Sequence, residues 1–236
     1  MRLMVSKGPL KWIQRALFIA AVSLFGYCGF VLVDTWVFQN RARRQLDRML
    51  ESSRTKPPTA PKDLPPVVTG GLLGRIEIPR LGVSVIVVEG TSTATLGRSA
   101  GHIAGTALPG KPGNVGISAH RDTFFRPLRN IRRNDIITLT TILGEYRYRV
   151  VSTKVVDPHN VSVLDPNGSE ILTLVTCYPF YFVGSAPDRF IVRAERVLGR
   201  VPRPALPRGR STQTGSRRRS RFRQGRQKAG LRSKGR

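Results

Sequence analysis

Cys177 and Arg189 are the residues whose types and positions could carry out nucleophilic chemistry. Residues 170–177 are rich in β-branched and apolar side chains, which is typical of a buried strand, and they end at the cysteine. A second strand is predicted to begin near Arg189, after a loop that contains glycine and proline. If the two strands pair antiparallel, Cys177 and Arg189 meet at one rim of the sheet although 12 positions separate them. A thiol beside a permanent cation is a candidate nucleophile, and a guanidinium can stabilise an oxyanion.

A histidine could supply the proton transfer that cysteine chemistry needs, since imidazole titrates near neutral pH. The chain has three histidines. His120 ends a predicted apolar strand at 114–119, whereas His102 and His159 lie in predicted loops. The residues alone make His120 the first candidate and His102 the second, and they leave open that Cys177 is a buried, inert thiol.

Two segments resemble the active-site motifs of sortases, which are membrane-anchored cysteine transpeptidases, and they are most similar to class D. The first segment reads Leu-Thr-Leu-Val-Thr-Cys-Tyr-Pro-Phe at 172–180 and continues with Ala-Pro-Asp-Arg-Phe-Ile-Val-Arg-Ala at 186–194. The second reads Gly-Ile-Ser-Ala-His-Arg-Asp-Thr-Phe-Phe at 116–125 and resembles the family's catalytic histidine segment. It has alanine at the position where many members have glycine. The resemblance covers about residues 72–197.

The resemblance implies a site of three residues. Cys177 is the nucleophile, His120 is the general acid and base, and Arg189 holds the substrate and the developing oxyanion. Such an enzyme cleaves an L-P-x-T-G-like sorting signal of a protein substrate through a thioacyl-enzyme and transfers the acyl group to an amine acceptor, on the envelope or on a partner protein. An L,D-transpeptidase is disfavoured because its histidine and cysteine signatures lie close together, whereas 57 positions separate His120 and Cys177. The non-enzymatic alternative is a membrane-tethered β-domain that binds through its basic tail.

The strand pattern indicates a mainly β catalytic domain at residues 72–199. Besides the two strands around the cysteine, strands are predicted at 73–78, 83–88, 114–119, 135–140 and 146–156. A short helix is predicted from Thr91, a loop at 101–113 and a helical turn at 125–131. This count suits a closed barrel or a sandwich equally, and the resemblance implies the sortase barrel of about eight strands. No Cys/His cluster has zinc-ligand spacing, so neither a metal nor another cofactor is predicted.

The N-terminal region predicts a membrane anchor. After a basic segment at 1–15 come 18 residues without charge, about 27 Å of helix, and tryptophans flank this run. We therefore predict a transmembrane helix at 16–38. A cleaved signal peptide is disfavoured because the run is long and no small-residue cleavage site follows. Basic residues stand on both sides, so charge leaves the orientation open, and the resemblance implies a single-pass protein with an extracytoplasmic domain.

The segments outside the membrane helix and the catalytic domain are polar. Residues 39–71 are predicted to form a juxtamembrane segment, with a short polar helix at 41–51, and a proline-rich linker that holds the domain off the membrane. Residues 200–236 contain 14 of the 40 Lys and Arg residues and no acid, so the chain's net charge of +26 comes chiefly from this tail. The tail is predicted to be disordered, and it could contact anionic lipid or an envelope polymer, bind nucleic acid, or be dispensable.

Overall fold

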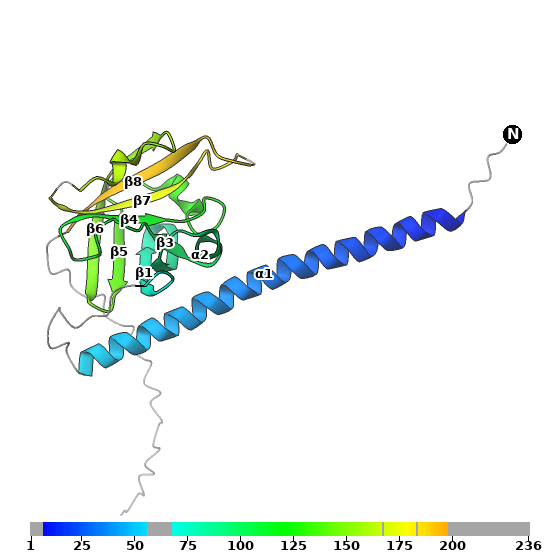
Figure 1. Cartoon of the computed structure of the whole chain (residues 1–236), viewed down its shortest axis with the longest axis horizontal. Coiled ribbons are helices and arrows are strands. Elements are labelled where there is room, and N and C mark those ends of the chain that lie inside the picture. The colour runs from blue at the N-terminus through cyan, green and yellow to red at the C-terminus, as the bar shows by residue number, and fades with distance from the viewer. Residues whose placement is uncertain (1–6, 56–67, 167, 183, 198–236) are drawn as a thin grey trace, which may run out of the picture. The chain divides into compact units, whose positions relative to one another are not determined.

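Eight strands form a closed β-barrel (Figure 1). The structure is a computed structural model that describes residues 7–55, 68–166, 168–182 and 184–197. The strands are β1 (Leu72–Ile78), β2 (Val83–Glu89), β3 (Ala100–His102), β4 (Gly113–Ser118), β5 (Ile136–Thr141), β6 (Gly144–Val156), β7 (Glu170–Tyr178) and β8 (Asp188–Arg196). Around the barrel they run in the order β1-β2-β3-β4-β7-β8-β6-β5. The predicted closed barrel is therefore confirmed, and the sandwich is excluded.

The barrel mixes strand directions in a way that places the ends of β4, β7 and β8 together. β4 pairs with β7 in parallel, and β7 pairs with β8 antiparallel. Because β4 and β7 are parallel, their C-terminal ends lie at the same edge, and the antiparallel β8 begins there. Apolar side chains that alternate along the strands fill the interior, among them Ile117 of β4, Leu172 and Leu174 of β7 and Val192 of β8, all fully buried.

Most local predictions agree with the structure. β1 and β2 form the predicted hairpin around the 3₁₀ turn η2 (Pro79–Leu81), which ends at Gly82 with a φ of 66°. The short helix predicted from Thr91 is α2 (Thr93–Arg98). Its N-cap is Ser92, whose hydroxyl accepts from the backbone N–H of Thr95. The predicted turn at 125–131 is the 3₁₀ helix η3 (Arg126–Asn130), and a further one, η4 (Val161–Leu164), precedes β7.

One predicted loop contains a short strand. Residues 101–113 were expected to be loop because they are rich in glycine and proline, but β3 includes the first two of them. β3 pairs in parallel with β2 and antiparallel with β4. These pairings join residues distant in sequence, so a three-residue strand leaves almost no local pattern to detect it.

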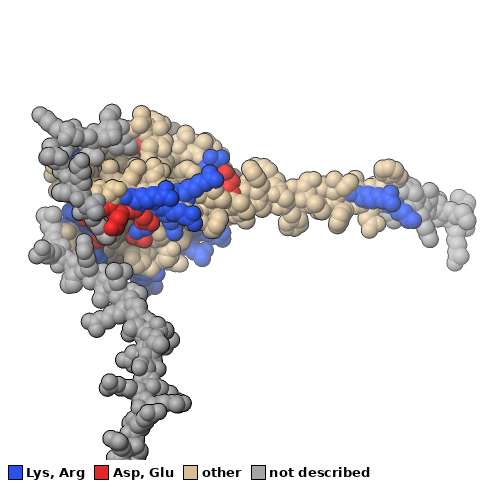
Figure 2. All heavy atoms as spheres, turned by 90° about the horizontal axis from the view of Figure 1, so that it is seen from below, with Lys and Arg blue, Asp and Glu red and all other residues tan. Residues whose placement is uncertain are grey.

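The N-terminal helix α1 (Lys7–Thr55) is one continuous helix of 49 residues. The sequence predicted a membrane helix at 16–38 and a separate polar helix at 41–51, but residues 34–55 contain neither proline nor glycine to interrupt it. Within α1, Lys11–Ser53 is long and apolar enough to cross a membrane. Figure 2 shows a stretch of helix without charged side chains between charged groups at its two ends. The predicted linker falls largely on residues 56–67 and the predicted tail on 200–236, which lie outside the described residues.

The second half of α1 packs against the barrel. Ala42 and Leu46 lie one helical turn apart and form a buried apolar cluster with Ile86 and Val88 of β2. β2 pairs with β3 only from Val87 onward, so part of its edge has no strand partner there. Side chains of α1 bind this edge: Gln39 Oε1 accepts from the N–H of Ile86, and Arg43 donates to the carbonyl of Ser84. The helix therefore covers a barrel edge as well as apolar surface.

An ion pair between Arg80 and Asp135 joins η2 to the start of β5. Arg80 Nε and Nη2 donate to the two carboxylate oxygens, and the N–H of Arg132 donates to one of them. The bonds from Arg80, followed by that from Arg132, hold the pKa of Asp135 below its usual range, although burial works against them.

We expect Asp135→Asn to lower the melting temperature by about 3–6 °C at pH 7, because one partner of a half-buried pair is lost. A carboxyl whose pKa is lowered by folding stabilises the protein above its unfolded pKa of about 4, and this contribution is lost as the pH falls through the folded pKa. The melting temperatures of the wild-type protein and Asp135→Asn, measured by thermal unfolding across pH, should therefore converge below about pH 4. Asp165→Asn, at an exposed position, is the control. A difference in melting temperature that stays the same at low pH would contradict a stabilising role of the ionised carboxylate.

Candidate active site

Strand pairing brings the predicted nucleophile and the predicted cation together. Cys177 of β7 and Arg189 of β8 are direct partners in the antiparallel ladder. On the other side of β7, Ser118 ends β4 opposite Val175. His120 follows two residues later, at the same edge of the barrel. The hairpin geometry expected from the 12-residue separation is confirmed.

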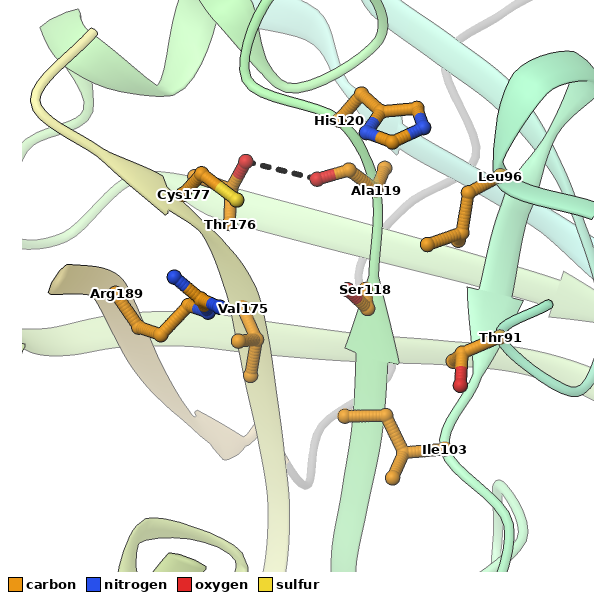
Figure 3. A pocket seen from close by; sticks show the side chains of 10 residues that line it. All are labelled: Thr91, Leu96, Ile103, Ser118, Ala119, His120, Val175, Thr176, Cys177 and Arg189. Atoms are coloured by element: carbon orange, nitrogen blue, oxygen red, sulfur yellow. Dashed lines mark hydrogen bonds between the residues drawn. The ribbon is translucent and has the colours of Figure 1, made fainter. Parts of the chain in front are cut away.

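All three predicted site residues line one cavity of about 310 Å³. Its lining comes from β4 and the two residues after it, from β7, β8 and α2, and from residues next to α2 and β3 (Figure 3). The lining residues are Thr91, Leu96, Ile103, Ser118, Ala119, His120, Val175, Thr176, Cys177 and Arg189. The cavity thus combines the three reactive side chains with aliphatic and hydroxyl side chains, as ligand sites commonly do.

Cys177 is a half-buried, unpaired thiol whose sulfur points into the cavity on the side of Ala119 and His120 (Figure 3). The preceding residue, Thr176, is buried and donates from its hydroxyl to the carbonyl of Ala119 at 2.8 Å. The N–H of Ala119 in turn donates to the carbonyl of Val175 at 3.3 Å. The first bond ties the residue before the cysteine to the residue before the histidine, and the second ties Ala119 to Val175. Sequence reasoning did not single out Thr176, although a hydroxyl within an apolar strand was a visible signal.

His120 is half-buried at the beginning of the loop that leaves β4. Its carbonyl accepts from the N–H of Phe125 at 3.1 Å, which folds the following segment back toward η3. The imidazole lies across the cavity from the sulfur of Cys177 (Figure 3). Among the described residues, no hydrogen bond joins the two side chains. Such contacts commonly tighten only when substrate is bound.

Arg189 is held by its own chain and directed toward Cys177 (Figure 3). Its Nη1 donates to the carbonyls of Ala186, at 3.3 Å, and Asp188, at 3.0 Å. Within the described part of the chain, its Nε and Nη2 have no hydrogen-bond partner. A guanidinium anchored at one end, with donors to spare at the other, can bind a carbonyl oxygen or an oxyanion at this rim.

The other two histidines lie outside the cavity. His102 is buried, and its Nδ1 lies 2.7 Å from the carboxylate of Glu89. Its Nε2 faces the carbonyl of Ala107 and the hydroxyl oxygen of Thr106, which donates its own hydrogen to the carbonyl of Ile103, so Nε2 must carry a hydrogen. This runner-up candidate is thus a fully bonded cross-link between β2, β3 and the next loop. His159 is almost fully exposed beside Asp157.

A family model for the sortase domain matches residues 76–197. The chain belongs to the sortase family. This sortase is 36% identical over 191 residues to Sortase D of Bacillus subtilis, an alignment that covers 77% of this chain and 96% of that protein. Over 110 residues, it is 34% identical to Sortase A of Listeria monocytogenes, which covers 45% of this chain and 49% of that protein.

Solved structures lead to the same family. The sortase D5 transpeptidase of Clostridium perfringens superposes with a TM-score of 0.59 at 25% identity, covering 68% of this chain and 99% of that one. Sortase A of Corynebacterium diphtheriae gives a TM-score of 0.52 at 25% identity, covering 70% of this chain and 92% of that one. The prediction of a class D-like sortase is confirmed, and with it the enzyme class of cysteine transpeptidases. Sortases act on proteins that carry sorting signals and on amine acceptors.

Proposed function

We propose that this sortase cleaves an L-P-x-T-G-like sorting signal through a thioacyl-enzyme on Cys177 and transfers the acyl group to an amine. The observation that carries this proposal is the presence of Cys177, His120 and Arg189 in one cavity, on three neighbouring strand ends. Thiol, imidazole and guanidinium supply a nucleophile, a proton carrier and an oxyanion donor, which is the set that acyl transfer needs.

The proposed first half-reaction forms a thioester. The sulfur of Cys177 attacks the carbonyl carbon of the scissile peptide bond while His120 takes the thiol proton. The oxyanion of the tetrahedral intermediate accepts hydrogen bonds from Arg189. The C–N bond then breaks, and His120 gives its proton to the leaving amine.

The second half-reaction reverses these roles. The acceptor amine attacks the thioester carbonyl and loses a proton to His120. The C–S bond breaks, and the thiolate of Cys177 takes the proton back, so that the enzyme regains its starting state. Water in place of the amine gives hydrolysis of the same intermediate.

The experiment that tests the proposal uses the full chain, because α1 contributes to the packing of the barrel. The protein in detergent micelles or nanodiscs is incubated with a panel of L-P-x-T-x peptides and an amine, and the products are followed by mass spectrometry. Cleavage with amine adducts is expected and would identify the preferred signal. A folded protein that cleaves no member of the panel would contradict an L-P-x-T-G-like specificity. Cleavage that yields only hydrolysis would contradict the tested amine as acceptor.

We expect Arg189→Met to lower kcat/KM by about 10²–10³-fold, because an oxyanion donor is lost while the apolar part of the side chain remains. Arg193→Met is the matched control, since Arg193 lies on the same strand four residues farther along and does not line the cavity. Steady-state kinetics on the best peptide of the panel measures both. Equal values of kcat/KM in the two variants would show that Arg189 does not stabilise the oxyanion.

We further propose that the helix at 16–38 anchors the enzyme as a single-pass protein with its catalytic domain on the extracytoplasmic side. The apolar length of α1 and the exposure of its side chains between residues 16 and 33 support the anchor. Protease digestion of spheroplasts tests on which side of the membrane the catalytic domain lies, because a cytoplasmic domain would resist digestion. Contact of the basic tail with anionic lipid or an envelope polymer stays a prediction.

A further inference from the structure

The residue after the proposed general acid makes an unusual set of contacts. Arg121 is only 5% exposed, and its guanidinium reaches three backbone carbonyls. Nη1 donates to Pro179 at 3.1 Å, and Nη2 donates to Phe182 at 2.6 Å and to Gly184 at 2.9 Å. The guanidinium carbon also lies 5.9 Å from the centre of the Phe182 ring.

These acceptors all belong to the segment that joins β7 to β8, described here at residues 179–182 and 184–187 and called the β7–β8 loop. Arg121 has a carboxylate neighbour in Asp122, but that side chain is 67% exposed and lies 3.5 Å from Nε. The buried charge is therefore compensated mainly by carbonyl dipoles of the loop. An apolar side chain at this position would leave the carbonyls of Phe182 and Gly184 without the donor that Arg121 supplies, whereas the carbonyl of Pro179 would keep its bond from the N–H of Phe182.

The same loop also contacts Arg189, beside the bond from Arg189 to the carbonyl of Asp188 at the start of β8. Nη1 of Arg189 donates to the carbonyl of Ala186, in the second half of the loop. Arg121 thus binds the loop as far as Gly184, and two residues later the carbonyl of Ala186 binds Arg189. Strand pairing already sets the backbone positions of Cys177 and Arg189, so what the loop adds is the direction of the guanidinium.

We propose that Arg121 is a positioning residue for the transfer reaction, which holds the β7–β8 loop against the His120 segment and thereby directs Arg189 toward Cys177. This inference rests on the proposed function of the three site residues. It assigns Arg121 no contact with substrate. Its effect should fall on the rate of the chemical steps and much less on substrate binding.

The test compares Arg121→Met and Arg121→Lys with Arg129→Met, at an exposed position in η3. For Arg121→Met we expect kcat to fall about tenfold or more with KM changed less than about threefold, and for Arg121→Lys a partial loss. Phe180, Tyr181 and Phe182 give chymotrypsin three sites in the loop. Loop cleavage should become several-fold faster in Arg121→Met, while the rest of the barrel stays resistant. Wild-type kcat together with wild-type loop cleavage would overturn the proposal, as would a loss of kcat without loop opening.

A second measurement separates this proposal from the proposed function. The alkylation rate of Cys177 by iodoacetamide, in a Cys28→Ala background, reports the surroundings of the thiol without any peptide. If the wild-type enzyme cleaves no peptide, the proposed function fails, and Arg121 is then judged by alkylation and loop cleavage alone. Unchanged values of both would overturn the positioning role. If Arg121→Met does not fold, Arg121→Lys decides by the same readouts.

Discussion

Replacing Cys177 with alanine should abolish both peptide cleavage and amine transfer, lowering kcat/KM by about 10³-fold or more. The reason is that the thiol forms the covalent bond on which both half-reactions depend, and no other cysteine lines the cavity. Because the side chain is half-buried at a strand end and loses only its sulfur, the fold should persist with little change in melting temperature.

The chain supplies its own control for this substitution. Cys28→Ala removes the second cysteine, which is exposed on the apolar stretch of α1, and should leave turnover unchanged. Mass spectrometry of the wild-type enzyme, quenched during turnover without amine, should detect the acyl mass on a peptide that contains Cys177. An acyl group on another residue, or full activity in Cys177→Ala, would refute the nucleophile assignment.

Replacing His120 with alanine should lower kcat by about 10²–10⁴-fold on peptide substrates, since the leaving amine then departs without a proton donor. A substrate whose leaving group needs no proton distinguishes proton donation by His120 from a change in the shape of the site. With a p-nitrophenyl ester of the same acyl sequence, the acylation rate of His120→Ala should fall less than with the peptide, because only the uptake of the thiol proton is then lost. Burst-phase kinetics, which isolate acylation, give that comparison.

His159→Ala is the control for His120, because its side chain is 94% exposed and lies outside the cavity. It should retain wild-type kinetics on both substrates. Equal losses for ester and peptide in His120→Ala would contradict proton donation to the leaving amine, and would assign the whole effect to removal of the thiol proton or to the shape of the site.

The hairpin of the site could be predicted because its register is a local property. Cys177 and Arg189 are separated by one turn-containing loop, so two adjacent apolar strands were enough to place them opposite one another. The strands of the β1–β2 hairpin and a short helix near Thr91 could likewise be predicted, since alternation, turn residues and capping side chains act within a few residues, although the cap is Ser92 and the helix begins at Thr93.

The choice between His120 and His102 could not be made from residue pattern alone, and it needed either the family resemblance or the fold. The pattern ranked His120 first because it follows a predicted apolar strand, but only the parallel pairing of β4 with β7 brings His120 to Cys177, across 57 residues of sequence. The same holds for β3, for the docking of α1 through Gln39 and Arg43, and for the contacts of Arg121 with the β7–β8 loop. Sequence alone determined most of the elements and the hairpin at the site, though not β3 or the continuity of α1, because turns and caps are encoded by neighbouring residues. Only the tertiary structure decided which distant residues share that site, because parallel pairing and helix docking depend on the closure of the whole barrel.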